Sequence, residues 1–409
     1  MSSYRTASSG HTRDLNRSAI FRMIVTAGPI ARTQIAKTLG LSPATVTAVT
    51  RELLDQGIVR VAERAPSKGG RPALLLELVG GAASAFGVKI APDHIFGVRV
   101  DLEAQLMQHY EAPFDPSGDG AIERLTETLG DWIRQLPGDP PLLGVGLGVA
   151  GVFDGRTGTL DSPLLGWRGL KLAQVVQEAL GLPVFVDNDV NTLAVAERLY
   201  GRGHDVENFL TVTIGRGVGL GIVTGGDIYR GFGGGAGEFG HTTAVADGAL
   251  CTCGKHGCLE TVVADPALIA EARRLGLLDE QQGIERLREL AREGQLQARQ
   301  IFHDAGTQLG RAVADLVNVL GPELVLVSGE GTQAWSYLGD AFAAAYETNV
   351  FPPLGTVPVE VDPWDESKWA IGAATLVLRS TFGAPLDNDK GESVRARLEA
   401  VAPAAGVVA

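Results

Sequence analysis

The sequence predicts an α/β body preceded by a small helix-turn-helix head. After residue 85, glycine-bounded runs rich in β-branched residues alternate with helical segments, a pattern typical of α/β layers. The first 60 residues instead contain three helical segments joined by short turns. Charge separates the two parts, because residues 1–76 carry 11 Lys/Arg and 4 Asp/Glu while the whole chain has a net charge of −13. A head of net charge +7 before an acidic body indicates an anionic partner for the head alone.

Three helices are expected in the head. The first covers 14–27 and ends at Gly28-Pro29, and the second covers about 32–39 and ends at Gly40. In the third, about 43–56, Ser42 is a good N-cap, Pro43 suits the first helical position, and Gly57 follows as a stop.

The third helix has one apolar face and one small polar face. At 100° per residue, Val46, Val49 and Leu53 share a stripe that must face the core. The opposite face carries small side chains and one arginine, which suits close approach to base edges and phosphates. We therefore expect DNA contacts from this helix and its cap, at Ser42, Ala44, Thr45, Thr47 and Arg51.

Two strands joined by a basic Gly/Pro loop follow, at 58–61 and 73–78, and they predict a wing. Lys68 and Arg71 in the loop are placed to reach a phosphate or the minor groove. The alternative is a small helical interaction domain with no role in DNA binding.

In the body, β-runs are expected at 86–90, 144–149, 183–187, 210–214 and 324–327, with helices at 121–136, 170–180, 191–200, 284–294 and 297–320. Ligands of α/β folds bind at the carboxyl ends of strands. Asn188-Asp189-Val190-Asn191 follows one such strand, and Asp189 has the chemistry of a general base. Taken alone, such a turn is more often an Asx-type helix cap.

All three cysteines fall within eight residues, at Cys251, Cys253 and Cys258, and His241 lies ten positions upstream. Three thiolates and one imidazole form a full tetrahedral set for a structural zinc ion, with no open position for a catalytic water. Buried thiols and an unrelated core histidine are the alternative. Clustered metal-type cysteines fit a reducing compartment, and no apolar run approaches the roughly 20 residues of a membrane helix. The expected location is therefore cytoplasmic, away from the membrane.

Together these motifs resemble the ROK family of repressors, open reading frames and sugar kinases. The resemblance covers about 15–385 and is carried by Asp189 with its flanking asparagines, Glu238-Phe239-Gly240-His241, the cysteine cluster, and Glu260. It implies an actin-like (sugar-kinase or ribonuclease H-like) body of two α/β lobes. It also implies zinc held by His241, Cys251, Cys253 and Cys258, and sugar hydroxyls contacted by Asn188, Asp189, Glu238, His241 and Glu260. The expected domains are the winged head at 1–75, a first lobe at 76–190, a second lobe with the zinc loop at 191–385, and a tail at 386–409.

The chain departs from the kinase members of that family at their phosphate-binding turns. Where those enzymes read Asp-x-Gly-Gly-Thr, this chain has Lys89-Ile90-Ala91-Pro92-Asp93. Pro92 has no N–H for a phosphate oxygen, and Asp93 repels one. A second turn, Gly-Thr-Gly in kinases, is here Gly215-Arg216-Gly217. We therefore expect no enzyme activity, with Asp189 a vestige of the catalytic base.

A further departure concerns the sugar, because Ser162-Pro163-Leu164-Leu165-Gly166-Trp167 lacks the asparagine that many members have before the glycine and tryptophan. Trp167 is either a stacking wall for a sugar or a core aromatic residue.

The sequence thus predicts a sugar-responsive transcriptional regulator, a repressor of carbohydrate-utilisation genes. Its expected partners are operator DNA and a small sugar effector, and the resemblance implies a homodimer or a dimer of dimers. One alternative is an ATP-dependent sugar kinase or a bifunctional kinase-regulator. Another is a constitutive DNA-binding protein with a vestigial pocket.

Overall fold

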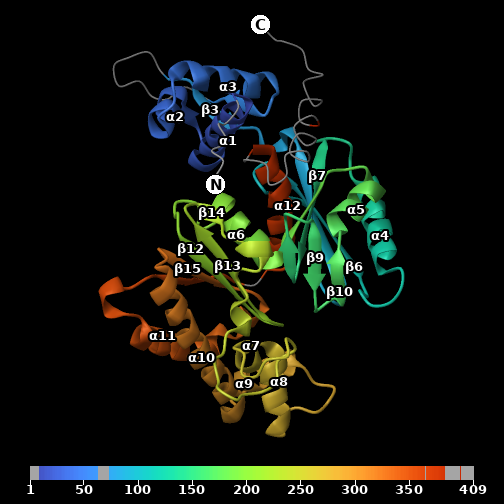
Figure 1. Cartoon of the computed structure of the whole chain (residues 1–409), viewed down its shortest axis with the longest axis vertical. Coiled ribbons are helices and arrows are strands. Elements are labelled where there is room, and N and C mark those ends of the chain that lie inside the picture. Colours follow the sequence, from blue (N-terminus) through green and yellow to red (C-terminus); the bar gives the residue numbers. More distant parts are fainter. Residues whose placement is uncertain (1–8, 63–72, 364, 383–396, 398–409) are drawn as a thin grey trace, which may run out of the picture. The chain divides into compact units, whose positions relative to one another are not determined.

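The computed structural model describes residues 9–62, 73–363, 365–382 and 397 (Figure 1). By compactness the chain divides into two units. Unit 1 contains residues 1–201 and 367–409, and unit 2 contains 202–366. The four-part division by function stays a prediction. The wing loop with Lys68 and Arg71 lies outside the described residues, as does the tail except for residue 397.

The head is built as predicted, from three helices and a small sheet. Its elements are α1 (Ser9–Ala27), β1 (Ile30–Ala31), α2 (Arg32–Leu39), α3 (Pro43–Asp55), β2 (Val59–Val61) and β3 (Leu75–Leu78). The antiparallel sheet has the order β1-β3-β2. Ser42 caps α3 by accepting a hydrogen bond from the Thr45 N–H, and Gly40 ends α2 in the left-handed region with φ 63°. Val46, Val49 and Leu53 are buried, as the helical stripe required.

The remainder of unit 1 is a five-stranded sheet with helices and one small accessory sheet. The elements are β4 (Ser84–Ile90), β5 (His94–Asp101), β6 (Leu106–Pro113), α4 (Ala121–Gln135), β7 (Leu142–Val149), β8 (Val152–Asp154), β9 (Thr159–Ser162), β10 (Trp167–Leu170), α5 (Leu172–Leu180), β11 (Val184–Asn188), α6 (Asp189–Tyr200) and α12 (Ser367–Phe382). The main sheet has the order β11-β7-β4-β5-β6, and its first three strands are parallel.

The helix α12 returns to unit 1 from the far end of the chain and packs on this sheet (Figure 1). Glycines make the close approach possible. A Cβ atom at Gly87 would overlap the carbonyl oxygen of Ala370, and one at Gly146 would overlap that of Ala373. The helix α12 is not among the elements expected from the sequence.

Unit 2 contains a second five-stranded sheet, of order β14-β13-β12-β15-β16. Its regular elements are β12 (Phe209–Ile214), β13 (Val218–Thr224), β14 (Asp227–Ile228), α7 (Glu260–Val263), α8 (Asp265–Arg274), α9 (Ile284–Arg292), α10 (Leu296–Leu320), β15 (Leu324–Ser328), α11 (Trp335–Asn349) and β16 (Val359–Val361). β12 and β13 form an antiparallel hairpin, while β12, β15 and β16 run parallel.

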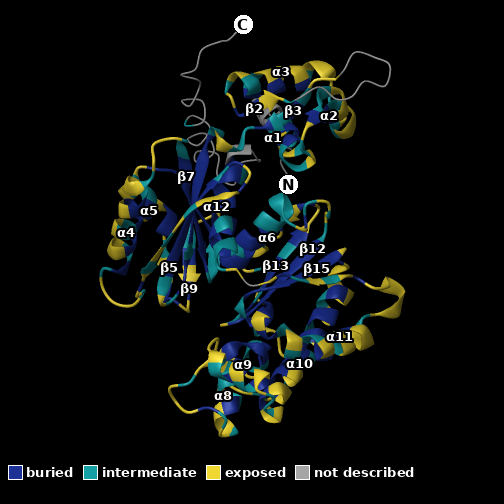
Figure 2. Ribbon diagram, turned by 180° about the vertical axis from the view of Figure 1, so that it is seen from behind, coloured by how far each residue is buried: buried dark blue, intermediate teal, exposed yellow. Residues whose placement is uncertain are grey.

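In both units the central strands are buried and the outer helix faces are exposed (Figure 2). Trp167 lies in the core of unit 1, with its ring edge-on to Phe114 and its Nε1 donating to Pro116 O at 3.3 Å. It is therefore a packing residue. Among the residues that the structure describes, no helix is both long and apolar enough to cross a bilayer.

Candidate functional site

In unit 1 the candidate polar residues gather where parallel strands end. β4 ends at Ile90 and β11 ends at Asn188, with β7 between them, so the carboxyl ends of all three share one edge. At this edge the Lys89 ammonium donates a hydrogen bond to Asp189 Oδ2. Lys89 Nζ also lies 4.6 Å from the centre of the Trp369 ring, which belongs to α12. The side chains of Lys89 and Asp189 are only 16% and 9% exposed.

Asn188 caps the helix α6. Its Oδ1 accepts hydrogen bonds from Val190 N at 2.9 Å and Asn191 N at 3.2 Å. Its Nδ2 donates to Gly151 O at 3.0 Å. The Asx-cap interpretation of this turn is therefore confirmed, and the cap sets the direction in which Asp189 leaves the sheet edge.

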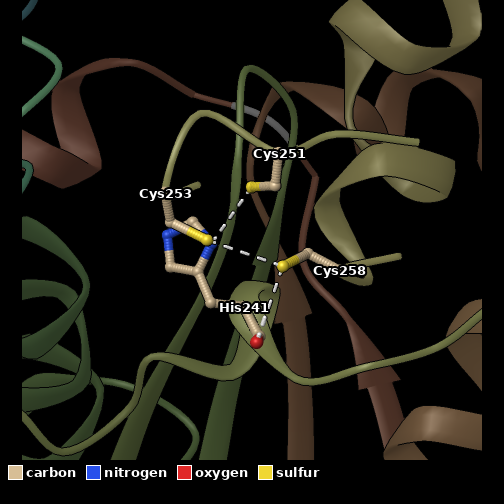
Figure 3. A group of neighbouring side chains, drawn as sticks. All are labelled: His241, Cys251, Cys253 and Cys258. Atoms are coloured by element: carbon tan, nitrogen blue, oxygen red, sulfur yellow. Dashed lines mark hydrogen bonds between the residues drawn. The ribbon is translucent and has the colours of Figure 1, made fainter. Parts of the chain in front are cut away.

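The predicted metal ligands come together in unit 2 (Figure 3). Ligand atoms of His241, Cys251, Cys253 and Cys258 all lie within 4.8 Å of one another. The Cys253 and Cys258 sulfurs are 3.6 Å apart. Two thiolates on one tetrahedral zinc ion lie about 3.8 Å apart, given Zn–S bonds of about 2.3 Å. The donor set and its spacing therefore fit a tetrahedral metal ion.

The two ring nitrogens of His241 face different groups. Nδ1 lies 3.5 Å from the Cys251 sulfur, and Nε2 lies 3.9 Å from Glu238 Oε2. A metal bound through Nδ1 would leave Nε2 directed toward Glu238. The loop is also held at its backbone, because Lys255 Nζ donates to His241 O at 2.6 Å.

The thiols differ in their surroundings. Burial, followed by bonds to the neighbouring cysteines, raises the pKa of the Cys258 thiol to about 11. A hydrogen bond with the backbone of Lys255 lowers the pKa of the exposed Cys253 thiol. Metal binding requires both as thiolates, so the loop without metal favours protonated Cys258.

Glu260 lies at the start of α7, beside the second glycine turn. Its Oε2 accepts a hydrogen bond from Val218 N at 3.3 Å, directly after Gly215-Arg216-Gly217. In the same turn Arg216 N donates to Glu330 Oε1 at 3.1 Å. Glu330 and Trp369 were not predicted from the sequence. Glu330 could have been found, because it lies between two glycines directly after an expected strand. Nothing in the sequence pattern connects Trp369 to Lys89.

The predicted effector residues are divided between the units. Asn188 and Asp189 belong to unit 1, and Glu238, His241 and Glu260 belong to unit 2. Asn188 and Asp189 lie at the sheet edge of unit 1. In unit 2, Glu238 and His241 lie in the loop before the cysteines, and Glu260 begins α7. The five-residue effector site stays a prediction.

The head presents the predicted face of α3 to solvent. Ala44, Thr47 and Arg51 are exposed, and the Arg51 side chain is 81% exposed with its Nε 4.0 Å from Asp55 Oδ2. The Ser42 hydroxyl also bonds the Thr45 hydroxyl at 2.8 Å. Two arginines outside this face hold α3 in place: Arg17 bonds Glu52 and Gln56, and Arg32 Nε donates to Thr50 Oγ1 at 2.7 Å.

Two family models match the chain. Residues 85–380 match the ROK family, and residues 13–60 match a winged helix-turn-helix DNA-binding model. Among curated relatives, the xylose repressor of Caldicellulosiruptor bescii is 29% identical over 91% of this chain and 98% of its own length. The DNA-binding transcriptional dual regulator NagC of Escherichia coli K12 is 29% identical over 90% of this chain and 93% of its own length.

Solved structures agree with these matches. A ROK family transcriptional regulator, described as a homologue of the E. coli MLC protein, has a TM-score of 0.80 at 25% identity, covering 95% of this chain and all of its own. A ROK family glucokinase from Streptomyces griseus, in complex with glucose and AMPPNP, has a TM-score of 0.64 at 28% identity and covers 72% of this chain and 99% of its own. The chain thus has a winged helix-turn-helix head at its N-terminal side, followed in sequence by a body with a sugar-kinase-like α/β fold. The family match covers well over half of the chain, which belongs to the ROK family.

Proposed function

We propose that this protein is a sugar-responsive transcriptional regulator that represses carbohydrate-utilisation genes. The observation that carries the proposal is the presence, in one chain, of a winged helix-turn-helix head and a ROK body. Relatives that match the chain over nearly their whole length are named a xylose repressor and the transcriptional regulator NagC. The basic charge of the head supports an anionic partner such as DNA.

The protein acts by binding and carries out no phosphoryl transfer. A general base must offer a carboxylate oxygen to the hydroxyl that it deprotonates. Asp189 Oδ2 instead accepts a hydrogen bond from Lys89. Lys89 stands at the position where the kinases that the chain resembles have the aspartate of the first phosphate-binding turn. The first phosphate turn contains Pro92, which offers no N–H, and the Asp93 carboxylate lies 2.7 Å from His94 Nδ1. These features support a body that recognises a ligand without transforming it.

The effector is a monosaccharide that Asn188, Asp189, Glu238, His241 and Glu260 contact through its hydroxyls. Carboxylates and amides supply the acceptors and donors that sugar hydroxyls require. Zinc on His241, Cys251, Cys253 and Cys258 holds the loop that presents Glu238 and Glu260. The zinc ion is structural, because four protein ligands complete its tetrahedron.

DNA is read by α3 together with the wing. The residues of α3 and its cap that face the major groove are Ser42, Ala44, Thr45, Thr47 and Arg51. From the wing, Lys68 and Arg71 reach the DNA phosphates or the minor groove. The protein works as a homodimer or a dimer of dimers in which each head binds one half-site of a near-palindromic operator. The sugar favours one arrangement of the body and so changes the spacing of the heads. In this division the head covers 1–75, the lobes cover 76–190 and 191–385, and 386–409 form the tail.

The test is fluorescence anisotropy of the full-length protein on DNA from upstream of its own gene, at fixed salt, titrated with free and phosphorylated monosaccharides. Specific binding that one sugar alters supports the proposal and identifies the effector. Specific binding that no sugar alters contradicts the sugar-responsive part. Absence of specific DNA binding, together with sugar-dependent ATP consumption, would favour the sugar kinase instead.

A further inference from the structure

The carboxyl ends of β12 and β15 form a second candidate ligand edge, within unit 2. The two strands are parallel neighbours, with Thr213 opposite Ser328. The segment that follows β15 therefore lies against the end of β12. A Cβ atom at Gly329 would overlap Ile214 O, and one at Gly331 would lie 3.0 Å from Ile214 Cγ1. Such edges of open α/β sheets are where ligands bind.

The turn after β12 already holds two anionic oxygens. Arg216 N donates to Glu330 Oε1 at 3.1 Å, and Val218 N donates to Glu260 Oε2 at 3.3 Å. Near-successive backbone N–H groups of a glycine-containing turn form an anion-binding concavity. Here both donors are satisfied by carboxylates of the same chain.

Glu330 is fixed in this position from several sides. Its side chain is 27% exposed and lies against Gly215, where an added Cβ would be 2.5 Å from Glu330 Cδ. Arg216 Nε lies 3.9 Å from Glu330 Oε1. The backbone is held as well, because the buried Arg288 donates from Nη2 to Glu330 O at 3.1 Å. The carboxylate is therefore a fixed part of the turn.

We propose that Glu330 is a built-in substitute for a phosphate group. Its carboxylate occupies the anion-binding turn Gly215–Val218, and it excludes phosphate-bearing ligands from this edge of unit 2. Glu330 is thus a specificity-determining residue. Glu330 excludes this class of ligand whichever sugar, if any, acts as effector.

The excluded class follows from charge. A phosphate oxygen placed on Arg216 N would compete for the same donor and would meet the Glu330 carboxylate at close range. Near a protein surface, like charges about 4 Å apart repel by more than the roughly 1.4 kcal/mol that corresponds to a tenfold change in affinity. Removing the carboxylate should therefore raise the affinity of the turn for phosphate at least about tenfold.

The experiment is equilibrium dialysis of the full-length protein against radiolabelled inorganic phosphate. Glu330→Ala is compared with wild type and with Glu347→Ala, a variant that removes the same charge from an exposed position on α11. We expect the Glu330 variant to bind about one phosphate per chain, at least about tenfold more tightly than the other two proteins. Adding Arg216→Ala to Glu330→Ala should reduce the gain, because the backbone N–H stays but the guanidinium, whose Nε lies 3.9 Å from Glu330 Oε1, is lost as a partner for the phosphate.

Glu330→Gln is the second variant, in case the alanine variant does not fold. Glutamine keeps an acceptor for Arg216 N but removes the charge, so a smaller gain over Glu347→Gln is expected. Phosphate binding that is equal in wild type and in a folded Glu330 variant overturns the proposal. A gain of equal size in Glu347→Ala also overturns it, because phosphate binding would then follow the net charge of the protein and not the loss of Glu330.

Discussion

Lys89 and Asp189, a hundred residues apart in the chain, form a largely buried ion pair beside the ring of Trp369. In this arrangement the carboxylate that resembles a kinase base is already bonded to an ammonium group. Lys89 holds the oxygen through which a base would act, and Trp369 holds Lys89. The pair therefore joins β4, α6 and α12 within unit 1.

The first prediction concerns the stability contributed by this pair. Lys89→Met should lower the free energy of unfolding by about 3 kcal/mol, because it leaves the Asp189 carboxylate buried without its cation. Lys89→Met combined with Asp189→Asn should recover most of that loss, since no unpaired charge remains. Urea denaturation measures both, with Lys171→Met as a surface control. A double variant no more stable than the single one would show that the pair is not the cause.

The second prediction concerns DNA binding. Arg51→Ala should weaken operator binding by about 1–3 kcal/mol and leave sugar affinity unchanged, because Arg51 is exposed on α3. Asp55→Asn should strengthen operator binding, because the Asp55 carboxylate lies 4.0 Å from Arg51 Nε and opposes phosphates. Anisotropy at several salt concentrations checks both. Equal loss of sugar and DNA binding in Arg51→Ala would contradict separate sites.

The third prediction concerns the effector. Glu238→Gln should preserve operator affinity while removing the response to sugar, because the amide no longer offers a charged acceptor to a hydroxyl. The measurement is the sugar concentration that half-maximally alters DNA binding, compared with Glu347→Gln. Release at the wild-type sugar concentration would show that Glu238 does not contact the effector.

The fourth prediction concerns the metal. Cys251→Ala, or chelation, should remove zinc, lower the thermal stability of the protein and abolish sugar binding, because the loop loses a tetrahedral ligand. His256→Ala is the matched control, since this histidine lies in the same loop with its Nδ1 3.0 Å from Gly248 O. Zinc content by atomic emission and sugar affinity by calorimetry are the measurements. Unchanged sugar affinity in zinc-free protein would refute the link.

The fifth prediction concerns pH. Burial raises the pKa of Asp265 to about 6, against the partial compensation of Arg288. Between about pH 4 and pH 6 the folded protein therefore binds a proton that the unfolded chain has released, so stability falls as the pH rises through this window. Asp265→Asn should flatten that part of the stability profile. An unchanged slope in urea denaturation between pH 4 and pH 6 would exclude Asp265 as its source.

The local sequence was sufficient to predict helices whose ends are set by one or two capping residues. The helix at 32–39 ends where Gly40 adopts φ 63°, and α3 begins at the Ser42 cap, because caps and left-handed turns depend on one or two residues. The grouping of His241, Cys251, Cys253 and Cys258 was also predictable, since the three thiols lie within eight residues and the histidine is only ten positions away.

Only the tertiary structure showed the pairs that change the chemistry of the body. Lys89 meets Asp189 across 100 positions, and Arg216 meets Glu330 across 114. Such contacts depend on which strand ends share a sheet edge, and strand order is not encoded in residue spacing. The packing of α12 against Gly87 and Gly146 is likewise a contact between distant parts of the chain that residue spacing does not show. The sequence thus determined the family, the head and the cluster of three cysteines and one histidine. The fold decided that Lys89 pairs with Asp189 and that Glu330 and Glu260 accept hydrogen bonds from the turn Gly215–Val218.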